Sequence, residues 1–373
     1  MTNFSRRSLL AAALPALASA CMASPTFPRH APASCTLAPA GGVSGFDPAK
    51  LRDVLASFED AHNDLHGLVV DRAGVTLLER YRRAEDHPVA QSGRMVAFDA
   101  CTLHDMRSIS KSVTSLAWGI AQGRGKTPPL QTCVLDLYPE LSDLKRDGRE
   151  RITLEHLLTM SNGLEWNEEN YGSPLNDEMA LYWRGSQARV TLERRVVAAP
   201  GAHFNYCGGN TAIIADLLTR FTDKSLPDFV DEYLFAPLGI DTWSWYRDYR
   251  GRPLAFAGLR LRPRDMIRIG RMILANGAAD GRQVVPAEWV ATSIAPHVAT
   301  GDGLNYGYFW WLGSVDALGG THNYAAGFGN GGQRLFIVPG LGLTVAITAG
   351  NYNGAAGRLS NTLFHRLGTA LIA

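Results

Sequence analysis

The segment from Met106 to Gly125 constrains the fold more than any other part of the chain. Lys111 is the only charged residue between Arg107 and Arg124, and apolar side chains recur in this segment at the spacing of one helix face. A helix that lacks a charged face after its first turn belongs in the interior of a protein. The sequence therefore predicts a central, buried helix that begins near Ser108 and carries one ammonium group.

Burying Lys111 has an energetic cost that needs an explanation. An ammonium group taken out of water costs several kcal/mol unless it is paired or neutralised. Desolvation lowers the pKa of a lysine from about 10.4, which lets the neutral amine act as a base near pH 7. Residues three apart on a helix are neighbours, so the amine can reach the Ser108 hydroxyl. Two interpretations stay open here: an activated serine nucleophile, or a structural lysine paired with a carboxylate such as Asp105.

Two glycine-rich segments further along offer the groups that a serine and lysine pair would need. The segment PGAHFNYCGGN (200–210) places Tyr206 just before an apolar helix, and AAGFGNGGQRLFIVP (325–339) leads directly into a strand. A phenol can transfer protons, and glycines let a substrate approach the backbone closely. We therefore expect Ser108, Lys111 and Tyr206 to meet in a catalytic site.

The order of strand and helix patterns predicts the architecture. Residues 65–83 contain two β-rich runs around a turn, YGYFWWLG (306–313) indicates a strand, and QRLFIVP and LTVAITAG near the C-terminus indicate a second hairpin. The middle of the chain is mostly helical, and residues 357–373 form a closing helix. This order predicts an α+β fold in which both termini build an antiparallel sheet flanked by helices. The expected bounds are 48–107 and 286–373 for the part with the sheet and 108–285 for the inserted helical part.

The first 25 residues have the composition of an export signal. SRRSLLAAALPALASAC contains paired arginines, a short apolar run and small residues before Cys21, as in twin-arginine signals. Cys21 is also a candidate for a lipid anchor. Neither this run nor any later one is long enough to span a bilayer. We expect an exported protein without a transmembrane segment, periplasmic or attached to the envelope, with residues 26–47 as a linker.

Export to an oxidising compartment would allow disulfides. Cys35, Cys101, Cys133 and Cys207 remain after the signal and allow three full pairings. A bridge between Cys101 and Cys133 is the favoured one, because the helix between them could fold back.

Several other functions are not favoured by the sequence. The chain has 36 basic and 35 acidic residues, so its net charge does not indicate nucleic-acid binding. GFGNGG (327–332) precedes a strand rather than opening a helix, which argues against a dinucleotide site. His62 and His66 stand at i and i+4, but the sequence supplies no third ligand beside them. We expect no metal, no cofactor and no nucleic-acid partner.

Four segments in this order resemble the serine β-lactamase and penicillin-recognising hydrolase superfamily: MRSISKSVTSL, ITLEHLLTMSNGLEW, FNYCGGN and GNGGQRLFIVP. The similarity runs from about residue 48 to the C-terminus and is greatest to class C-type esterases and 6-aminohexanoate-dimer hydrolases. It implies a β-lactamase/transpeptidase-like fold and an acyl-enzyme on Ser108, with Lys111 as proton acceptor and Tyr206 as proton shuttle. The backbone N–H groups of Ser108 and Gln333 would form the oxyanion hole. Expected substrate contacts are Gly208, Asn330, Gly331, Gly332, Glu165 and Trp166.

Two departures from the family pattern bear on the substrate. The second motif usually reads Tyr-x-Asn, and Gly208 stands here in place of the asparagine. The third motif usually begins with a basic residue, and here begins with Asn330. Losing a charge-assisted contact to a substrate carboxylate costs about 1.5 to 3 kcal/mol. A hydrolase of small esters, amides or β-lactam-like molecules is implied, with esters or small amides favoured. The alternatives are a true β-lactamase or D-alanyl-D-alanine carboxypeptidase, and a catalytically silent envelope-binding module.

Overall fold

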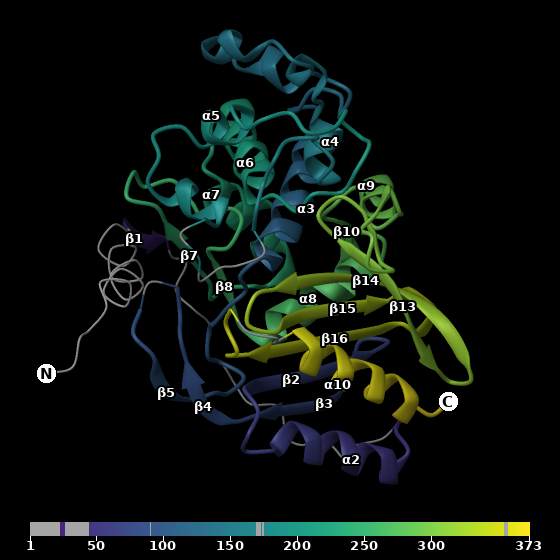
Figure 1. Ribbon diagram of the computed structural model, residues 1–373. Coiled ribbons are helices and arrows are strands. Elements are labelled where there is room, and N and C mark those ends of the chain that lie inside the picture. Colours follow the sequence, from purple (N-terminus) through teal and green to yellow (C-terminus); the bar gives the residue numbers. More distant parts are fainter. Residues whose placement is uncertain (1–22, 27–44, 90, 169–172, 174, 354–356) are drawn as a thin grey trace, which may run out of the picture.

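An eight-stranded antiparallel sheet forms the base of the protein (Figure 1). The computed structural model describes residues 23–26, 45–89, 91–168, 173, 175–353 and 357–373. The strand order is β11-β12-β13-β14-β15-β16-β2-β3. The N-terminal segment supplies β2 (Leu65–Arg72) and β3 (Val75–Tyr81). The C-terminal segment supplies β11 (Val298–Ala299), β12 (Asn305–Tyr306), β13 (Trp311–Ala317), β14 (Gly320–Gly329), β15 (Gln333–Val338) and β16 (Leu343–Ala349). The prediction that both ends of the chain build one antiparallel sheet is confirmed.

Alternation along the central strands explains why both faces of the sheet are covered. In β2, Leu68 and Val70 point to a core shared with α2 (Pro48–Glu59) and α10 (Gly357–Ala370). Val69 points to the opposite core, where α8 (Pro263–Leu274) packs against β2, β15 and β16. Strand side chains alternate between faces, so two apolar sets on one strand require a layer on each side.

The helical part stands on the second face of the sheet (Figure 1). Its centre is α3 (Ile109–Gly123), in which every residue from Ile109 to Ala121 is buried. The surrounding helices are α4 (Leu154–Leu158), α5 (Gln187–Leu192), α6 (Gly208–Thr222), α7 (Leu226–Val230) and α9 (Ala287–Ser293). The predicted central, buried helix is therefore confirmed.

Smaller sheets connect the two parts. One has the order β1-β7-β8-β6, and its last strand leads directly into α3. Its strands are β1 (Ala23–Thr26), β7 (Ser244–Arg247), β8 (Leu259–Leu261) and β6 (His104–Asp105). The others are the hairpins β4 (Arg83–Asp86) with β5 (Arg94–Ala97) and β9 (Ala278–Ala279) with β10 (Arg282–Gln283).

Two expectations differ from the structure. Residues 306–313 are not one strand, because the chain turns between β12 and β13, where Gly307 N–H donates to the Trp310 carbonyl (2.8 Å) and Phe309 has φ 63°. The Cys101–Cys133 bridge is wrong: Cys133 is free, as is Cys207, whereas Cys101 is disulfide-bonded.

The remaining N-terminal predictions are not tested. Residues 1–22, with Cys21, and residues 27–44 lie outside the described part of the chain. Within the described part, no helix combines the length and the apolar character that crossing a membrane requires.

Two glycines at the end of β14 allow α3 to approach the sheet. A Cβ at Gly329 would lie 2.3 Å from the Met106 carbonyl, and one at Gly327 would lie 3.3 Å from Ile109. Met106 immediately precedes the turn into α3, so the backbone at the end of β14 is in close contact with the backbone that enters α3. The start of α3 is thereby fixed against the β14–β15 turn.

We predict that Gly329→Ala destabilises the protein by about 1–3 kcal/mol, because the new methyl overlaps the Met106 carbonyl and forces the backbone to shift. Urea unfolding followed by circular dichroism measures the change. Gly320→Ala in the same strand is the matched control, since its Cβ would meet only His322 Nε2, at 3.6 Å. Equal unfolding midpoints for the two variants would contradict this account of the packing.

Candidate active site

Ser108 and Lys111 occupy the first turn of α3, as expected. Ser108 caps the helix and is 8% exposed, while Lys111 is 1% exposed. Lys111 Nζ donates to Ser108 Oγ at 3.0 Å and to the Phe256 carbonyl at 3.1 Å. Met106 N–H bonds to the Leu259 carbonyl in β8 (2.9 Å), which fixes the chain just before the serine. The predicted approach of the amine to the hydroxyl is present.

Tyr206 lies over the same ammonium group. Lys111 Nζ is 4.7 Å from the centre of the Tyr206 ring, and the phenol also interacts with Ser108. Burial raises the pKa of Tyr206, although the Lys111 charge acts in the opposite direction. The phenol is therefore a neutral O–H donor at neutral pH. The structure brings all three predicted catalytic residues together.

Two buried carboxylates complete the site, and the sequence analysis missed both. Lys111 Nζ is 3.4 Å from Glu168 Oε1 and 3.9 Å from Glu178 Oε2. Glu168 Oε2 accepts hydrogen bonds from Trp166 Nε1 (2.8 Å) and from the Gly208 N–H (2.6 Å). Both carboxylates are at most 5% exposed. Each belongs to a polar stretch of sequence of the kind that usually lies in solvent, so no local signal distinguished them.

These carboxylates reverse the expected direction of the Lys111 pKa shift. Burial alone lowers it, but Tyr206, Glu168 and Glu178 outweigh burial and raise the pKa. Burial also opposes ionisation of Glu168, yet the Lys111 charge and hydrogen bonds hold its pKa below the ordinary value. Burial and the neighbouring Glu168 raise the pKa of Glu178 well above its ordinary value. The prediction of an uncharged amine is wrong, because an ammonium group paired with the Glu168 carboxylate is favoured here.

Gly208 leaves space for the two carboxylates because it has no side chain. It is the first residue of α6, and a Cβ there would lie 3.1 Å from both Glu168 Oε2 and Glu178 Oε2. A side chain at this position would therefore require the two carboxylates to shift.

The second glycine-rich segment, residues 325–339, contains the turn from β14 into β15. The Gln333 side chain is tied to β16 by hydrogen bonds with the Ala349 backbone (2.5 and 3.0 Å). Gly331 and Gly332 have φ of 94° and 97°, a backbone conformation that favours glycine. The Asn330 amide donates to Asn353 Oδ1 at 2.7 Å and accepts from the Asn353 N–H at 3.0 Å. Asn330 therefore links two loops, and its role as a substrate contact stays a prediction.

Glu165 and Trp166 are in different surroundings. Glu165 is exposed and pairs with Arg195 (2.8 Å), and its described contacts do not reach Ser108, Lys111 or Tyr206. Trp166 is 6% exposed and holds Glu168. A contact with substrate remains a prediction for both, and the geometry assigns Trp166 to the support of a carboxylate.

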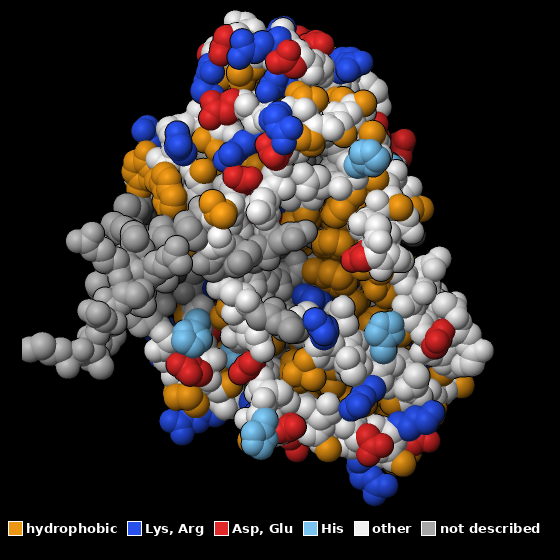
Figure 2. Space-filling view, in the orientation of Figure 1, with side chains coloured by type: hydrophobic (Ala, Val, Ile, Leu, Met, Phe, Trp, Pro, Cys, Tyr) orange, Lys and Arg blue, Asp and Glu red, His pale blue; other side chains and the backbone are white. Residues whose placement is uncertain are grey.

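Aromatic rings surround the Tyr206 side of the site. The Tyr206 ring lies 5.6 Å from Trp311 and 6.3 Å from Tyr306, and Trp311 stacks on Phe328 at 5.5 Å. Figure 2 shows this face of the molecule hollowed between the helical part and the sheet, with hydrophobic side chains inside the hollow. The surroundings of the phenol therefore suit an apolar substrate segment.

Fold and site together define a hydrolase with the β-lactamase/transpeptidase-like architecture. A family model described as Beta-lactamase matches residues 67–367, and the chain belongs to this family. The 6-aminohexanoate-dimer hydrolase of Paenarthrobacter ureafaciens is 26% identical over 338 residues, which cover 81% of this chain and 80% of the relative.

Solved structures with the same fold include proteins of two kinds. A Bacillus anthracis protein described as a 6-aminohexanoate-dimer hydrolase superposes with a TM-score of 0.72 at 19% identity, covering 98% of each chain. A family VIII carboxylesterase superposes with a TM-score of 0.62 at 15% identity, covering 89% of this chain and 99% of the other. At these identities the likeness of the structures concerns the fold.

We predict that side chains introduced at Gly208 disturb the carboxylates in order of size. Gly208→Ala places a methyl 3.1 Å from both carboxylate oxygens, and Gly208→Asn adds a larger side chain at the same point. The stability loss should be below about 1 kcal/mol for alanine and about 1–3 kcal/mol for asparagine. Urea unfolding measures both variants. An asparagine variant as stable as the wild type would show that the carboxylates can move aside.

Proposed function

We propose that this hydrolase cleaves ester or small amide bonds through an acyl-enzyme on Ser108. One observation carries the proposal: a fully buried lysine lies 3.0 Å from a serine hydroxyl at a helix start, beneath a neutral tyrosine. Ser108 Oγ attacks the substrate carbonyl and forms an ester with the acyl group. Water then attacks that ester and releases the acid, which restores the hydroxyl.

The serine proton needs an acceptor other than a free amine, because the Lys111 pKa is raised. We propose that the ammonium passes a proton to Glu168 while its nitrogen takes the proton of Ser108. Lys111 is charged before and after this step, and the net transfer is from the hydroxyl to the carboxylate. The 3.0 and 3.4 Å contacts of Nζ support this relay. The neutral Tyr206 phenol then donates its proton to the leaving group. In the second step the phenol oxygen takes a proton from the attacking water, and Glu168 returns its proton through Lys111 to Ser108 Oγ.

The developing oxyanion needs backbone donors. Ser108 N–H lies at the start of α3, where N–H groups lack helical partners and the helix dipole favours negative charge. Gln333 N–H is the proposed second donor. The close approach of Gly329 to the Met106 carbonyl supports this pairing, because Gly329 is the strand partner of Gln333 at the start of β15.

The charges around the site favour substrates that are not anions. Asn330 replaces the usual basic residue, and Glu168 stands beside Lys111. The names of the relatives point to linear amides and carboxylic esters. We propose a neutral or amine-bearing ester or linear amide as the substrate.

We also propose that the protein is exported to the periplasm or envelope. The twin-arginine-like segment carries this proposal, and the disulfide at Cys101 agrees with an oxidising compartment.

Ser108→Ala should reduce p-nitrophenyl ester hydrolysis by at least about 10³-fold without altering the circular dichroism spectrum, because the acyl acceptor is removed. The wild type is measured on a panel of an ester, 6-aminohexanoate dimer and nitrocefin. A fluorophosphonate probe should label Ser108. Retained turnover in the variant refutes the assignment, absence of labelling and turnover indicates a silent binding module, and nitrocefin turnover equal to the ester rate indicates a β-lactamase.

Glu168→Gln should lower kcat at pH 7 by about 10²–10⁴-fold, since the proton acceptor is lost. Wild-type activity should fall only as pH drops below the ordinary glutamate value of 4.5, because the Glu168 pKa is lowered. In the variant, one of the charges that hold the Lys111 pKa up is gone, so activity should rise with alkaline pH as the amine loses its proton.

Glu178→Gln is the matched control for this pH profile. Burial and Glu168 raise the pKa of Glu178, and Glu178 lies farther from Lys111 Nζ than Glu168 does (3.9 Å against 3.4 Å), so an amide of the same shape should lower kcat much less than Glu168→Gln does. Equal losses in the two variants, or a Glu168→Gln profile that matches the wild type, would exclude Glu168 as the proton acceptor.

A further inference from the structure

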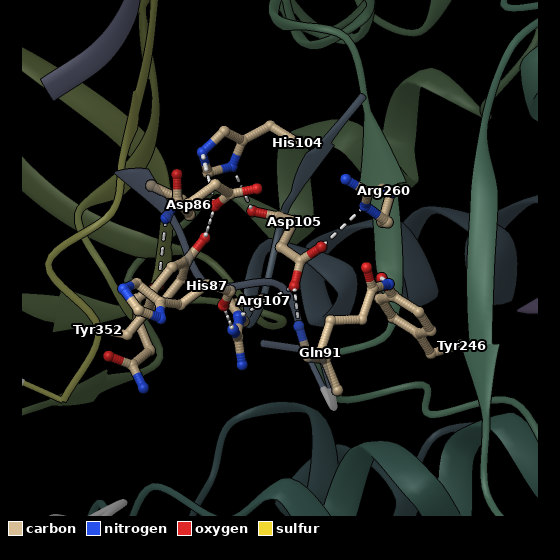
Figure 3. A network of polar contacts seen from close by, with 12 residues as sticks. Asp86, His87, Gln91, His104, Asp105, Arg107, Tyr246, Arg260 and Tyr352 are labelled. Carbon is tan, nitrogen blue, oxygen red and sulfur yellow. Dashed lines mark hydrogen bonds and ion pairs between the residues drawn. The ribbon is translucent and has the colours of Figure 1, made fainter. Parts of the chain in front are cut away.

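Three buried polar side chains lie close together at β6, the strand that leads to Ser108. His66 in β2, Asp86 in β4 and His104 in β6 are each at most 1% exposed. His66 Nδ1 is 2.8 Å from His104 Nε2, and Asp86 Oδ1 is 3.9 Å from the same nitrogen. One ligand atom from each residue lies within 4.8 Å of the other two. Figure 3 shows Asp86 and His104 facing one another.

Each neutral imidazole carries one ring proton, and these two protons cannot satisfy all the contacts that the ring nitrogens of His66 and His104 make. His104 Nδ1 is 3.1 Å from the Asp105 carbonyl, so Nδ1 carries the ring proton and Nε2 presents a lone pair to His66. If His66 places its proton on Nδ1, it satisfies His104, but its buried Nε2 is then a lone pair that faces the Glu85 carbonyl and is unsatisfied. If the proton is on Nε2, two lone pairs face one another at 2.8 Å. Either arrangement leaves a buried polar atom unsatisfied.

A cation between the rings removes this conflict. Both facing nitrogens then act as ligands, and His66 Nε2 keeps its proton for the Glu85 carbonyl, which acts on this ring. Ligating histidines commonly donate their other N–H to a carbonyl in this way. Zn–N bonds of about 2.0–2.1 Å place two ligand nitrogens about 3.4 Å apart, so the rings need to separate by only about 0.6 Å.

The surroundings hold the three side chains in place. Phe98 stacks on His66 with ring centres 4.3 Å apart, and the Tyr352 hydroxyl donates to Asp86 Oδ1 at 3.2 Å. A Cβ at Gly350 would lie 2.6 Å from His66 Nε2, so only glycine lets the backbone pass this ring. An apolar wall and a hydrogen-bonded carboxylate are typical of the outer shell of a metal site.

We propose that His66, Asp86 and His104 bind one divalent transition-metal ion, with Zn²⁺ the best match to two imidazoles and a carboxylate. The ion fixes β2, β4 and β6 to one another. Asp105, next to His104, pairs with Arg260 Nε in β8 (2.8 Å) and accepts from the Val89 N–H (2.7 Å). The site therefore supports the entrance to α3, and its role is structural. This inference does not depend on the proposed reaction.

The proposed ligand pair, His66 and His104, differs from the pair that the sequence spacing suggests, His62 and His66. His62 and His66 are neighbours in sequence, but His62 is exposed and contacts Asp60 (3.0 Å). The real neighbour of His66 is His104, 38 positions away. His62 is therefore a suitable control residue.

The test measures metal in the full-length protein after removal of any affinity tag. Elemental analysis of protein dialysed with Zn²⁺ should give about one ion per chain. Asp86→Asn and His66→Gln should weaken binding by at least about 10- to 100-fold, and His62→Ala should bind like the wild type. Chelation should lower the Tm of the wild type, and Zn²⁺ but not Mg²⁺ should restore it.

Co²⁺ provides a second measurement on the wild-type protein if the variants do not fold. Bound Co²⁺ should give the visible absorption bands of a low-coordinate nitrogen and oxygen site, and excess Zn²⁺ should remove them. A wild-type protein that takes up neither ion, with no change in Tm, would overturn the proposal in favour of a protonated histidine pair. Full metal content in Asp86→Asn and His66→Gln would overturn it as well.

Discussion

The ammonium group of Lys111 is the constraint around which the site is organised. Its burial would cost several kcal/mol without partners, and the partners come from distant parts of the chain. Glu168 follows α4, Glu178 precedes α5, and the Phe256 carbonyl precedes β8. Each segment must be in place before the charge is compensated. Removing one partner of a buried pair typically costs about 3–5 kcal/mol, which links the formation of the site to the stability of the helical part.

The sheet contributes to the same site through close contact of backbones. The end of β14 lies against the residues that lead into α3, and the β14–β15 turn is anchored to β16 by Gln333. The proposed donors of the oxyanion hole therefore belong to two layers that cannot slide past one another. Preorganised donors of this kind stabilise developing charge without reorganisation during the reaction.

The sequence was informative where a pattern is local. The buried character of α3, the two hairpins and the contact between Ser108 and Lys111 follow from helix and strand periodicity, and all are present. Glu168 could not be found in this way, because it lies 57 positions from Lys111 in a polar segment. The direction of the Lys111 pKa shift was predicted wrongly for the same reason. Burial can be predicted from one helix, whereas the charges that oppose it come from elsewhere in the chain.

The two departures from the family pattern have different physical meanings. At position 208, a Cβ would lie 3.1 Å from a carboxylate oxygen of both Glu168 and Glu178, so glycine leaves space for the two acids. At position 330, the basic residue is replaced by an amide that joins the β14–β15 turn to Asn353. The first change gives Lys111 a carboxylate partner, and the second removes a cation from the substrate side. Both changes support the proposal of a substrate that is not an anion, and the serine, the lysine and the phenol stay in contact.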